Sequence, residues 1–377
     1  MLPPLSLYIH FPWCIQKCPY CDFNSHAVKN DLPESRYIQT LLTDLETDLA
    51  LLPKPGTITS IFMGGGTPSL FSADALNALL DGVKARVNLA TDCEITLEAN
   101  PGTFESAKFK AYRDLGINRL SIGIQSFNDT HLKQLGRVHN ATEALKAVEI
   151  ALTAGFDNLN LDLMFGLPGQ TMEEAVTDIH TAIKLAPTHI SFYQLTLEPN
   201  TYFYKFPPKL PEDEAIFSLQ TACQQILAQQ GYQQYEISAY AQSGCQSRHN
   251  RNYWQFGDYL GIGAGAHGKI TQQLPQHILR TAKPKSPEHY LQKPTASLIQ
   301  PIEIAQLPLE FVMNHLRLKT GFSLIQYVTA TGLPISTLEP ALADCVRLGL
   351  LQLQNSQVLC SEQGWNFLDE VLEKFIP

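Results

Sequence analysis

The chain has 377 residues, 44% of them hydrophobic and 17% charged, and its formal net charge at pH 7 is −9. This composition is typical of a packed globular protein and excludes global disorder. The acidic balance argues against nucleic acid as a partner. The sequence contains no apolar run long enough to span a bilayer and no secretory signal at its start. We therefore expect a cytoplasmic protein with reduced cysteines.

Short β-branched or aromatic runs alternate with amphipathic helical patterns through the first two-thirds of the chain. The predicted strands are 5–11, 59–66, 94–100, 119–127, 158–167 and 189–196. Helical patterns between them include 36–52, 72–87 and 171–186. Ser72 is a candidate N-cap, and Thr171 with Glu174 forms a capping-box pattern. Strand–helix units about 30 residues apart predict parallel strands with right-handed crossovers.

The predicted strands end in polar, charged or glycine residues. These strand ends carry His10, Gly64–Gly66, Glu98, Gln125 and Asp162. Ligand sites of parallel α/β folds lie at the carboxyl ends of the strands, which converge on one mouth in a barrel. Polar groups from nearly every strand therefore favour an α/β fold with a partial barrel over an open sheet. No G-x-G-x-x-G follows the first strand, which argues against a dinucleotide-binding fold.

The pattern changes after residue 235, which divides the chain into three predicted parts. Residues 1–235 form the barrel, and residues 236–308, rich in glycine, aromatic residues and proline, are predicted to be an irregular cover and linker. Residues 309–377 predict two helices, a hairpin and a closing helix, as in a small winged-helix-like α+β domain. This last part has no basic cluster, so we expect it to pack or to bind protein rather than DNA.

The loop at 10–24 follows the first predicted strand and contains three cysteines, Cys14, Cys18 and Cys21. The C-x-x-x-C-x-x-C spacing lets three thiolates face one point at the barrel mouth. One interpretation is a zinc site completed by His10 or Asp22. The other is a four-iron cluster with three protein ligands, whose fourth iron is open to a small molecule.

The cysteine spacing resembles that of the radical S-adenosylmethionine superfamily, whose fold is a partial (β/α)6 barrel. In that superfamily a [4Fe-4S] cluster leaves one iron open, and S-adenosyl-L-methionine chelates it through its amino and carboxylate groups. The resemblance implies contacts to this cofactor from Tyr8, Tyr20, Gly65 and Glu98. Glycines without a Cβ permit close approach of the backbone to a ligand, and a carboxylate suits ribose hydroxyls.

The resemblance extends over essentially the whole chain. Segments such as LYIHFPWC, GGGTPS, EANPGT, SIGIQSF and GIGAGAHGK resemble the family that contains oxygen-independent coproporphyrinogen III oxidase and a heme chaperone. Phe23 stands where the oxidase has a further cysteine, and the thirteen residues before Cys14 are too few for the oxidase's N-terminal cover. Both departures favour the chaperone. The expected function is binding of heme and its delivery to respiratory apo-proteins, including membrane-bound ones, without coproporphyrinogen oxidase activity.

The segment HNRNYW at 249–254 matches a motif of these chaperones and implies a heme site. His249 is the candidate axial ligand, and Asn250 and Tyr253 are candidates to orient its ring or to contact the propionates. The alternative is that His249 only forms a hydrogen bond within the cover segment. Cys245 and His267 are weaker candidates for the ligand.

The family also places a second S-adenosylmethionine in the oxidase barrel. Its contacts map onto Gly66, Thr67, Gln125, Arg137 and Asp162. These residues are equally compatible with an internal ion pair between Arg137 and Asp162. The resemblance further implies a cluster-dependent homodimer that contacts the inner face of the membrane during heme transfer. Coproporphyrinogen decarboxylation and a zinc-binding scaffold remain the alternative functions.

Overall fold

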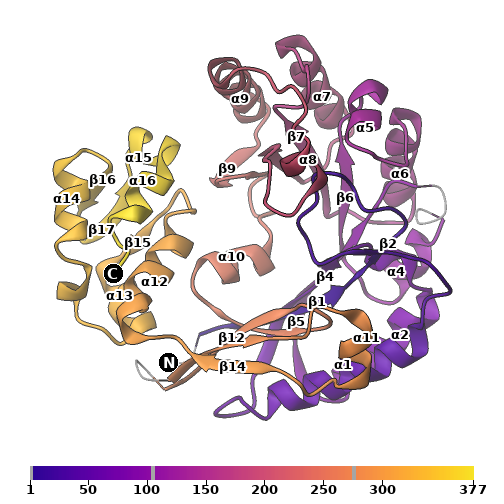
Figure 1. The fold of residues 1–377 in the computed structure, drawn as a ribbon, viewed down its shortest axis with the longest axis horizontal. Coiled ribbons are helices and arrows are strands. Elements are labelled where there is room, and N and C mark those ends of the chain that lie inside the picture. Colours follow the sequence, from indigo (N-terminus) through magenta and orange to yellow (C-terminus); the bar gives the residue numbers. More distant parts are fainter. Residues whose placement is uncertain (1–2, 103–106, 274–276) are drawn as a thin grey trace.

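The computed structural model describes residues 3–102, 107–273 and 277–377. Within these ranges the main sheet has twelve strands in the order β14-β13-β12-β11-β1-β4-β5-β6-β7-β8-β10-β9 (Figure 1). The six predicted barrel strands are β1 (Leu5–Phe11), β4 (Thr57–Gly65), β5 (Asn88–Ala99), β6 (Arg119–Gln125), β7 (Leu159–Phe165) and β8 (His189–Gln194). They pair in chain order and all run parallel. The predicted partial (β/α)6 barrel is confirmed.

The connecting helices lie outside the curved sheet (Figure 1). They are α1 (Glu34–Leu49), α2 (Ala73–Lys84), α4 (Phe109–Asp114), α5 (Asp129–Gln134), α6 (Ala141–Thr153), α7 (Met172–Lys184) and α9 (Asp213–Gln229). The short helix α8 (Tyr202–Lys205) instead lies beside the cysteine loop, where the amide of Phe203 donates to the carbonyl oxygen of Pro19 at 3.0 Å. Both predicted caps are present: Ser72 Oγ accepts from the amide of Ala75, and Thr171 and Glu174 form a reciprocal capping box. Leu7 and Ile9, which share one face of β1, are fully buried.

The segment predicted as an irregular cover is largely regular, so that prediction is wrong. It contains β10 (Ala239–Ala241), α10 (Arg248–Trp254), β11 (Asp258–Ile262), β12 (His267–Gln273), β13 (His277–Ala282), α11 (Pro287–Gln292) and β14 (Leu298–Pro301), and β9 (Gln233–Glu236) precedes it. Strand β11 extends the parallel sheet beyond β1, and β12–β14 continue it antiparallel.

Glycine and proline misled the sequence prediction at this point. Gly261 lies so close to the facing strand that a Cβ would stand 1.8 Å from the carbonyl oxygen of His267. The glycine is therefore a strand residue that permits close backbone approach. Pro287 occupies the first turn of α11, where its missing N–H costs nothing.

The C-terminal part is a small α+β unit beside the sheet, drawn in orange and yellow in Figure 1. Its elements are η2 (Ile304–Gln306), α12 (Leu307–His315), β15 (Phe322–Ser323), α13 (Leu324–Thr331), η3 (Ile335–Leu338), α14 (Ala341–Arg347), β16 (Leu351–Gln354), β17 (Gln357–Cys360), α15 (Glu362–Asn366) and α16 (Leu368–Glu373). The three strands form an antiparallel sheet in the order β15-β17-β16. The predicted hairpin and winged-helix-like arrangement are confirmed. No helix within the described ranges is long and apolar enough to cross a bilayer.

Candidate functional site

The three-cysteine loop leaves the carboxyl end of β1 and is anchored to the glycine segment that ends β4. Strands β2 (Trp13–Cys14) and β3 (His26–Ala27) pair within it. The amide of Gly66 donates to the carbonyl oxygen of Phe11 at 2.6 Å, and the amide of Thr67 donates to that of Trp13 at 2.7 Å. A Cβ on Gly66 would lie 2.4 Å from the oxygen of Trp13. Only glycine therefore permits this attachment.

The three cysteines face one cavity of about 460 Å³, which we call the cluster cavity. It is also lined by most of the residues expected to contact S-adenosylmethionine: Tyr20, Gly65, Gly66, Thr67, Glu98, Gln125, Arg137 and Asp162. Tyr8 is the exception, because it lies in a second cavity described below. In the part of the chain that the structure describes, no three His, Cys, Asp or Glu side chains are gathered tightly enough to hold a metal ion. The three thiols line this one space, so three thiolates are available there to a metal centre.

Glu98, at the end of β5, accepts a hydrogen bond from the amide of Gly65 at 3.1 Å. Burial, together with the negative charge of Asp162, raises the pKa of this carboxyl to about 8. Glu98 is therefore largely protonated at neutral pH when no cation is bound nearby. A protonated carboxyl at this position can both donate to and accept from a hydroxyl group.

Arg137 and Asp162 do not form the ion pair that the sequence left open. Arg137 donates from Nη2 to Asn100 Oδ1 at 2.6 Å and to the carbonyl oxygen of Gly123 at 2.9 Å. Asp162 instead accepts from Ser121 Oγ and Asn160 Nδ2. Each side chain is instead engaged by its own neighbours. Arg137 Nε is buried without a hydrogen-bond partner, and the side chain lines the cluster cavity.

Sequence reasoning missed several residues of the cluster cavity, among them Asn100, Ser191 and Tyr193. Tyr193 donates to Gln125 Oε1 at 2.6 Å, and Gln125 adopts a left-handed φ of 69° at the end of β6. The sequence signal that could have identified two of them is the strand HISFYQ, in which alternate residues share a face. This places Ser191 and Tyr193 on one face of β8.

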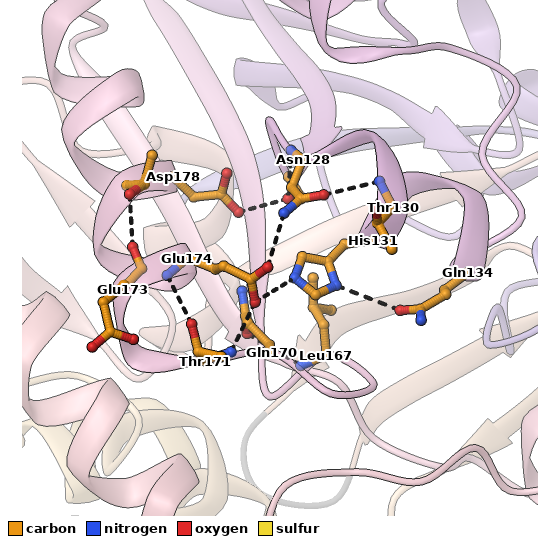
Figure 2. A network of polar contacts seen from close by, with 12 residues as sticks. Asn128, Thr130, His131, Gln134, Leu167, Gln170, Thr171, Glu173, Glu174 and Asp178 are labelled. Atoms are coloured by element: carbon orange, nitrogen blue, oxygen red, sulfur yellow. Dashed lines mark hydrogen bonds and ion pairs between the residues drawn. The ribbon is translucent and has the colours of Figure 1, made fainter.

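A polar network fixes the turn that follows Gln125 (Figure 2). Asp178 on α7 accepts from Ser126 Oγ at 2.6 Å and from the amide of Phe127 at 2.7 Å. Glu174, one turn earlier, accepts from Asn128 Nδ2 at 3.1 Å and lies 3.1 Å from His131 Nε2. Helix α7 thereby holds the turn between β6 and α5. This turn positions Gln125 at the edge of the cluster cavity.

A second, larger cavity of about 910 Å³ adjoins the first, and we call it the His249 cavity. Its aromatic lining comprises Tyr8, Phe23, Phe62, Tyr253, Trp254 and Tyr259, and its imidazoles are His10, His249 and His267. Asn250 lies in the same lining, whereas Cys245 does not. The two cavities share Lys17, Cys21, Phe23, Gly65 and Glu98. The space beside the cysteine loop is therefore continuous with the space beside His249.

His249 projects from α10 toward the sheet with one ring nitrogen engaged. Its Nδ1 lies 3.3 Å from Ser60 Oγ, which in turn lies 2.7 Å from Ser6 Oγ. Its Nε2 has no hydrogen-bond partner among the described residues. Burial, with a smaller effect of Arg119, lowers the pKa of His249 to about 3. The imidazole is therefore neutral, as a metal ligand must be.

The carboxylate of Glu94 holds the start of α10. The amides of Arg248 and His249 both donate to it, at 3.0 Å and 3.2 Å. Ser247 caps the same helix by accepting from the amide of Asn250 at 3.3 Å. An anion at a helix N-terminus is favourable because it meets unpaired N–H groups and the positive end of the dipole. These contacts fix His249 against β4.

Comparisons with known proteins agree with this arrangement. A profile of the radical SAM superfamily matches residues 8–182, and a profile of the HemN C-terminal domain matches residues 305–367. The chain is 49% identical over 376 residues to the heme chaperone HemW of Escherichia coli (strain K12), covering 100% of this chain and 99% of that one. The chain belongs to the HemW family of radical SAM proteins.

Two more relatives with that name are similarly covered. Heme chaperone HemW of Haemophilus influenzae (strain ATCC 51907 / DSM 11121 / KW20 / Rd) is 49% identical, over 100% of this chain and 98% of its own. That of Bacillus subtilis (strain 168) is 34% identical, over 98% and 99%. The solved structure of coproporphyrinogen III oxidase (HemN) from Escherichia coli matches with a TM-score of 0.83 at 20% identity, over 99% of this chain and 90% of that one. This likeness shows the shared fold.

The radical SAM superfamily holds a [4Fe-4S] cluster and S-adenosylmethionine, and the cluster cavity fits both. Cys14, Cys18 and Cys21 supply thiolates around one space. Arg137, whose Nε is buried without a hydrogen-bond partner among the described residues, lines the same space. When bound, the cluster would supply an open iron for S-adenosylmethionine to chelate. The side chains around it bind and orient that cofactor.

Proposed function

We propose that this protein is a heme chaperone, which binds heme in the His249 cavity and transfers it to apo-proteins. The observation that carries the proposal is the state of His249: a neutral imidazole in an aromatic cavity, oriented through Nδ1 by Ser60, with no described residue forming a hydrogen bond to Nε2. Imidazole is a common axial ligand of heme iron. A hydrogen bond to the second ring nitrogen is the usual way in which proteins orient such a ligand.

The volume and lining of the His249 cavity support binding of a porphyrin. Its volume of about 910 Å³ lies in the upper part of the usual range for ligand sites, which is about 300–1,000 Å³. Aromatic side chains line the cavity, and Lys17 and Lys285 also belong to its lining. A macrocycle with an apolar body and two carboxylates requires both kinds of contact. Asn250 and Tyr253 are proposed to help place the propionates or the histidine.

Phe23 supports the choice of heme binding over porphyrinogen oxidation. Its side chain is 60% exposed although it is large and apolar, and it lines both cavities. An exposed aromatic at the junction of two cavities is suited to contact a flat apolar ligand. It stands where the oxidase carries its extra cysteine.

The remaining parts of the proposal concern the partners. We propose respiratory hemoproteins as acceptors, some of them at the inner face of the membrane, and a cytoplasmic location for the chaperone. A homodimer that forms when the cluster is bound is part of the same proposal. We divide the chain into a barrel (1–235), a connecting segment (236–308) and a C-terminal unit (309–377). In this proposal the C-terminal unit provides the surface on which heme-accepting proteins dock.

Coproporphyrinogen decarboxylation remains a second candidate function. The residues that map onto a second S-adenosylmethionine, namely Gly66, Thr67, Gln125, Arg137 and Asp162, line the same cavity as the cysteines. Occupancy by two cofactor molecules is compatible with that placement. An anaerobic assay with reductant separates the two functions, because stoichiometric protoporphyrinogen would identify the protein as an oxidase.

Heme titration of anaerobically reconstituted protein tests the primary proposal. His249→Ala is expected to weaken heme binding by at least about tenfold, or about 1.4 kcal/mol, and to shift the Soret band. His267→Ala, in the same cavity, is the matched comparison and should leave the band unchanged. Equal affinity and identical spectra for wild type and His249→Ala would remove His249 as the ligand. Tightly bound zinc in place of iron and sulfide would refute the cluster.

A further inference from the structure

Asn24 joins the cysteine loop to the wall of the His249 cavity. Its Nδ2 donates to the carbonyl oxygen of Ala264 at 2.8 Å and to that of Lys285 at 2.9 Å. Ala264 precedes β12, and Lys285 follows β13. One amide group therefore ties two segments more than 200 residues away in the sequence to the loop that carries the cluster ligands.

The main chain of Asn24 is fixed on the opposite side. Its carbonyl oxygen accepts from His10 Nε2 at 2.9 Å, and His10 Nδ1 accepts from the hydroxyl of Tyr8 at 2.9 Å. This assignment uses one ring proton, which agrees with the lowered pKa that burial gives His10. The tyrosine is anchored on β1. A continuous chain of hydrogen bonds thus runs from the sheet through Asn24 to Ala264 and Lys285.

Close packing accompanies these bonds. A Cβ on Gly265, whose φ is 80°, would lie 2.3 Å from Asn24 Nδ2. The segment before β12 therefore has a glycine at the point where Asn24 approaches it. His267, two residues further on, and Lys285 both line the His249 cavity, together with Asn24 itself. A displacement of Asn24 must change the wall of that cavity.

The loop geometry links Asn24 to the cluster. Cys21 lies three residues before Asn24 and lines both cavities. The intervening turn is tight, because the carbonyl oxygen of Phe23 accepts from the amide of Ser25 at 2.7 Å and from Lys17 Nζ at 3.0 Å. If iron fixed the Cys21 thiolate, this tight turn would leave the Asn24 side chain little freedom to move. The amide group of Asn24, which holds the cavity wall, would therefore be fixed as well.

We propose that Asn24 is a positioning residue that couples the two cavities, so that a cluster bound at Cys21 strengthens binding of the occupant of the His249 cavity. The identity of that occupant as heme rests on the proposed function. Coupling between two sites is reciprocal in free energy. Bound heme must therefore also slow the removal of the cluster by an iron chelator, and this effect must depend on Asn24 as well.

Heme titrations of cluster-loaded and cluster-free protein, both anaerobic, test the coupling. In wild type we expect the two affinities to differ by about 5- to 100-fold, the usual range for coupled sites. Asn24→Asp keeps the shape but removes both donated hydrogen bonds, so the ratio should fall toward one. Asn366→Asp makes the same exchange at an exposed position of α15 that lines neither cavity, and should retain the ratio.

Gly265→Ala perturbs the same contact from outside the loop and serves if Asn24→Asp fails to take up a cluster. It too should lower the ratio toward one. An unchanged ratio in either cluster-competent variant overturns the role of Asn24. Equal heme affinity of loaded and cluster-free wild type overturns the coupling while leaving the heme chaperone intact. Absence of heme binding in wild type refutes the proposed function itself.

Discussion

Arg137 donates a hydrogen bond from Nη1 to the Sγ of Cys18 at 3.5 Å, so a permanent positive charge stands beside a proposed cluster ligand. The guanidinium reaches this position from the segment after α5 because Asn100 and Gly123 hold its other amino group. A hydrogen bond to a ligand sulfur and a nearby cation both stabilise the more negative, reduced state of a cluster.

Replacement of Arg137 should therefore lower the reduction potential of the cluster. Arg137→Met removes both charge and hydrogen bond, and Arg137→Lys retains only the charge, so the methionine variant should show the larger shift. Anaerobic redox titration followed by electron paramagnetic resonance measures the potential. Arg347→Met, on the exposed helix α14, is the control for a general change in charge. An unchanged potential in Arg137→Met would contradict the assigned contact.

Glu98→Gln should alter the pH dependence of stability in protein free of cofactors. The pKa of Glu98 is about 8 in the fold and about 4.5 in its ordinary state. The folded protein therefore holds a proton that the unfolded chain releases as the pH rises from about 4.5 to 8, and this lowers the free energy of unfolding over that interval. Glutamine removes the penalty and keeps an acceptor for Gly65.

Melting temperatures at pH 5, 6, 7 and 8 provide the measurement. The variant should gain stability relative to wild type as the pH rises through this series. A difference that stays constant across the series would show that Glu98 is ionised throughout.

Lys283→Met should strongly destabilise the protein. Lys283 Nζ lies 2.5 Å from Asp44 Oδ1 and 2.6 Å from Asp48 Oδ1, and all three side chains are fully buried. Removal of the cation leaves two carboxylates unpaired in the interior, which typically costs about 3–5 kcal/mol. Denaturant unfolding measures the loss. Lys110→Met breaks an exposed pair with Asp114 and should cost about 1 kcal/mol or less; similar losses in both variants would argue against a buried ion cluster.

Gly66→Ala should impair assembly of the site with only a modest effect on the fold. The added methyl group would meet the backbone oxygen of Trp13, which no rotamer change can relieve. We expect a cost of about 1–3 kcal/mol and less iron and sulfide per chain after reconstitution. Gly116→Ala, where a Cβ meets nothing within 4 Å, separates this effect from the general strain of replacing a glycine. Wild-type iron content in Gly66→Ala would contradict the attachment of the loop to this segment.

Local patterns explain the successful sequence predictions. The six barrel strands and the caps at Ser72 and Thr171 follow from residue spacing within a few turns or pleats. Local patterns predict the site less well. The sequence assigns Tyr8 and Tyr20 to the same cofactor, whereas in the structure they line different cavities. Successive residues of a strand face opposite sides, but which space a side chain enters depends on neighbouring strands. The same limit explains the wrong prediction of an irregular segment where β11–β14 lie.

The sequence by itself determined the cysteine loop, the alternation of strands and helices and the polar residues at the strand ends, since each depends on short-range spacing. Tertiary structure decided that Arg137 contacts Cys18 and not Asp162, and that Asn24 reaches Ala264 and Lys285. It also decided that two cavities adjoin. These contacts join residues up to 261 positions apart. Such pairs are selected by the packing of whole elements, and no local pattern records which partner a buried polar group will find.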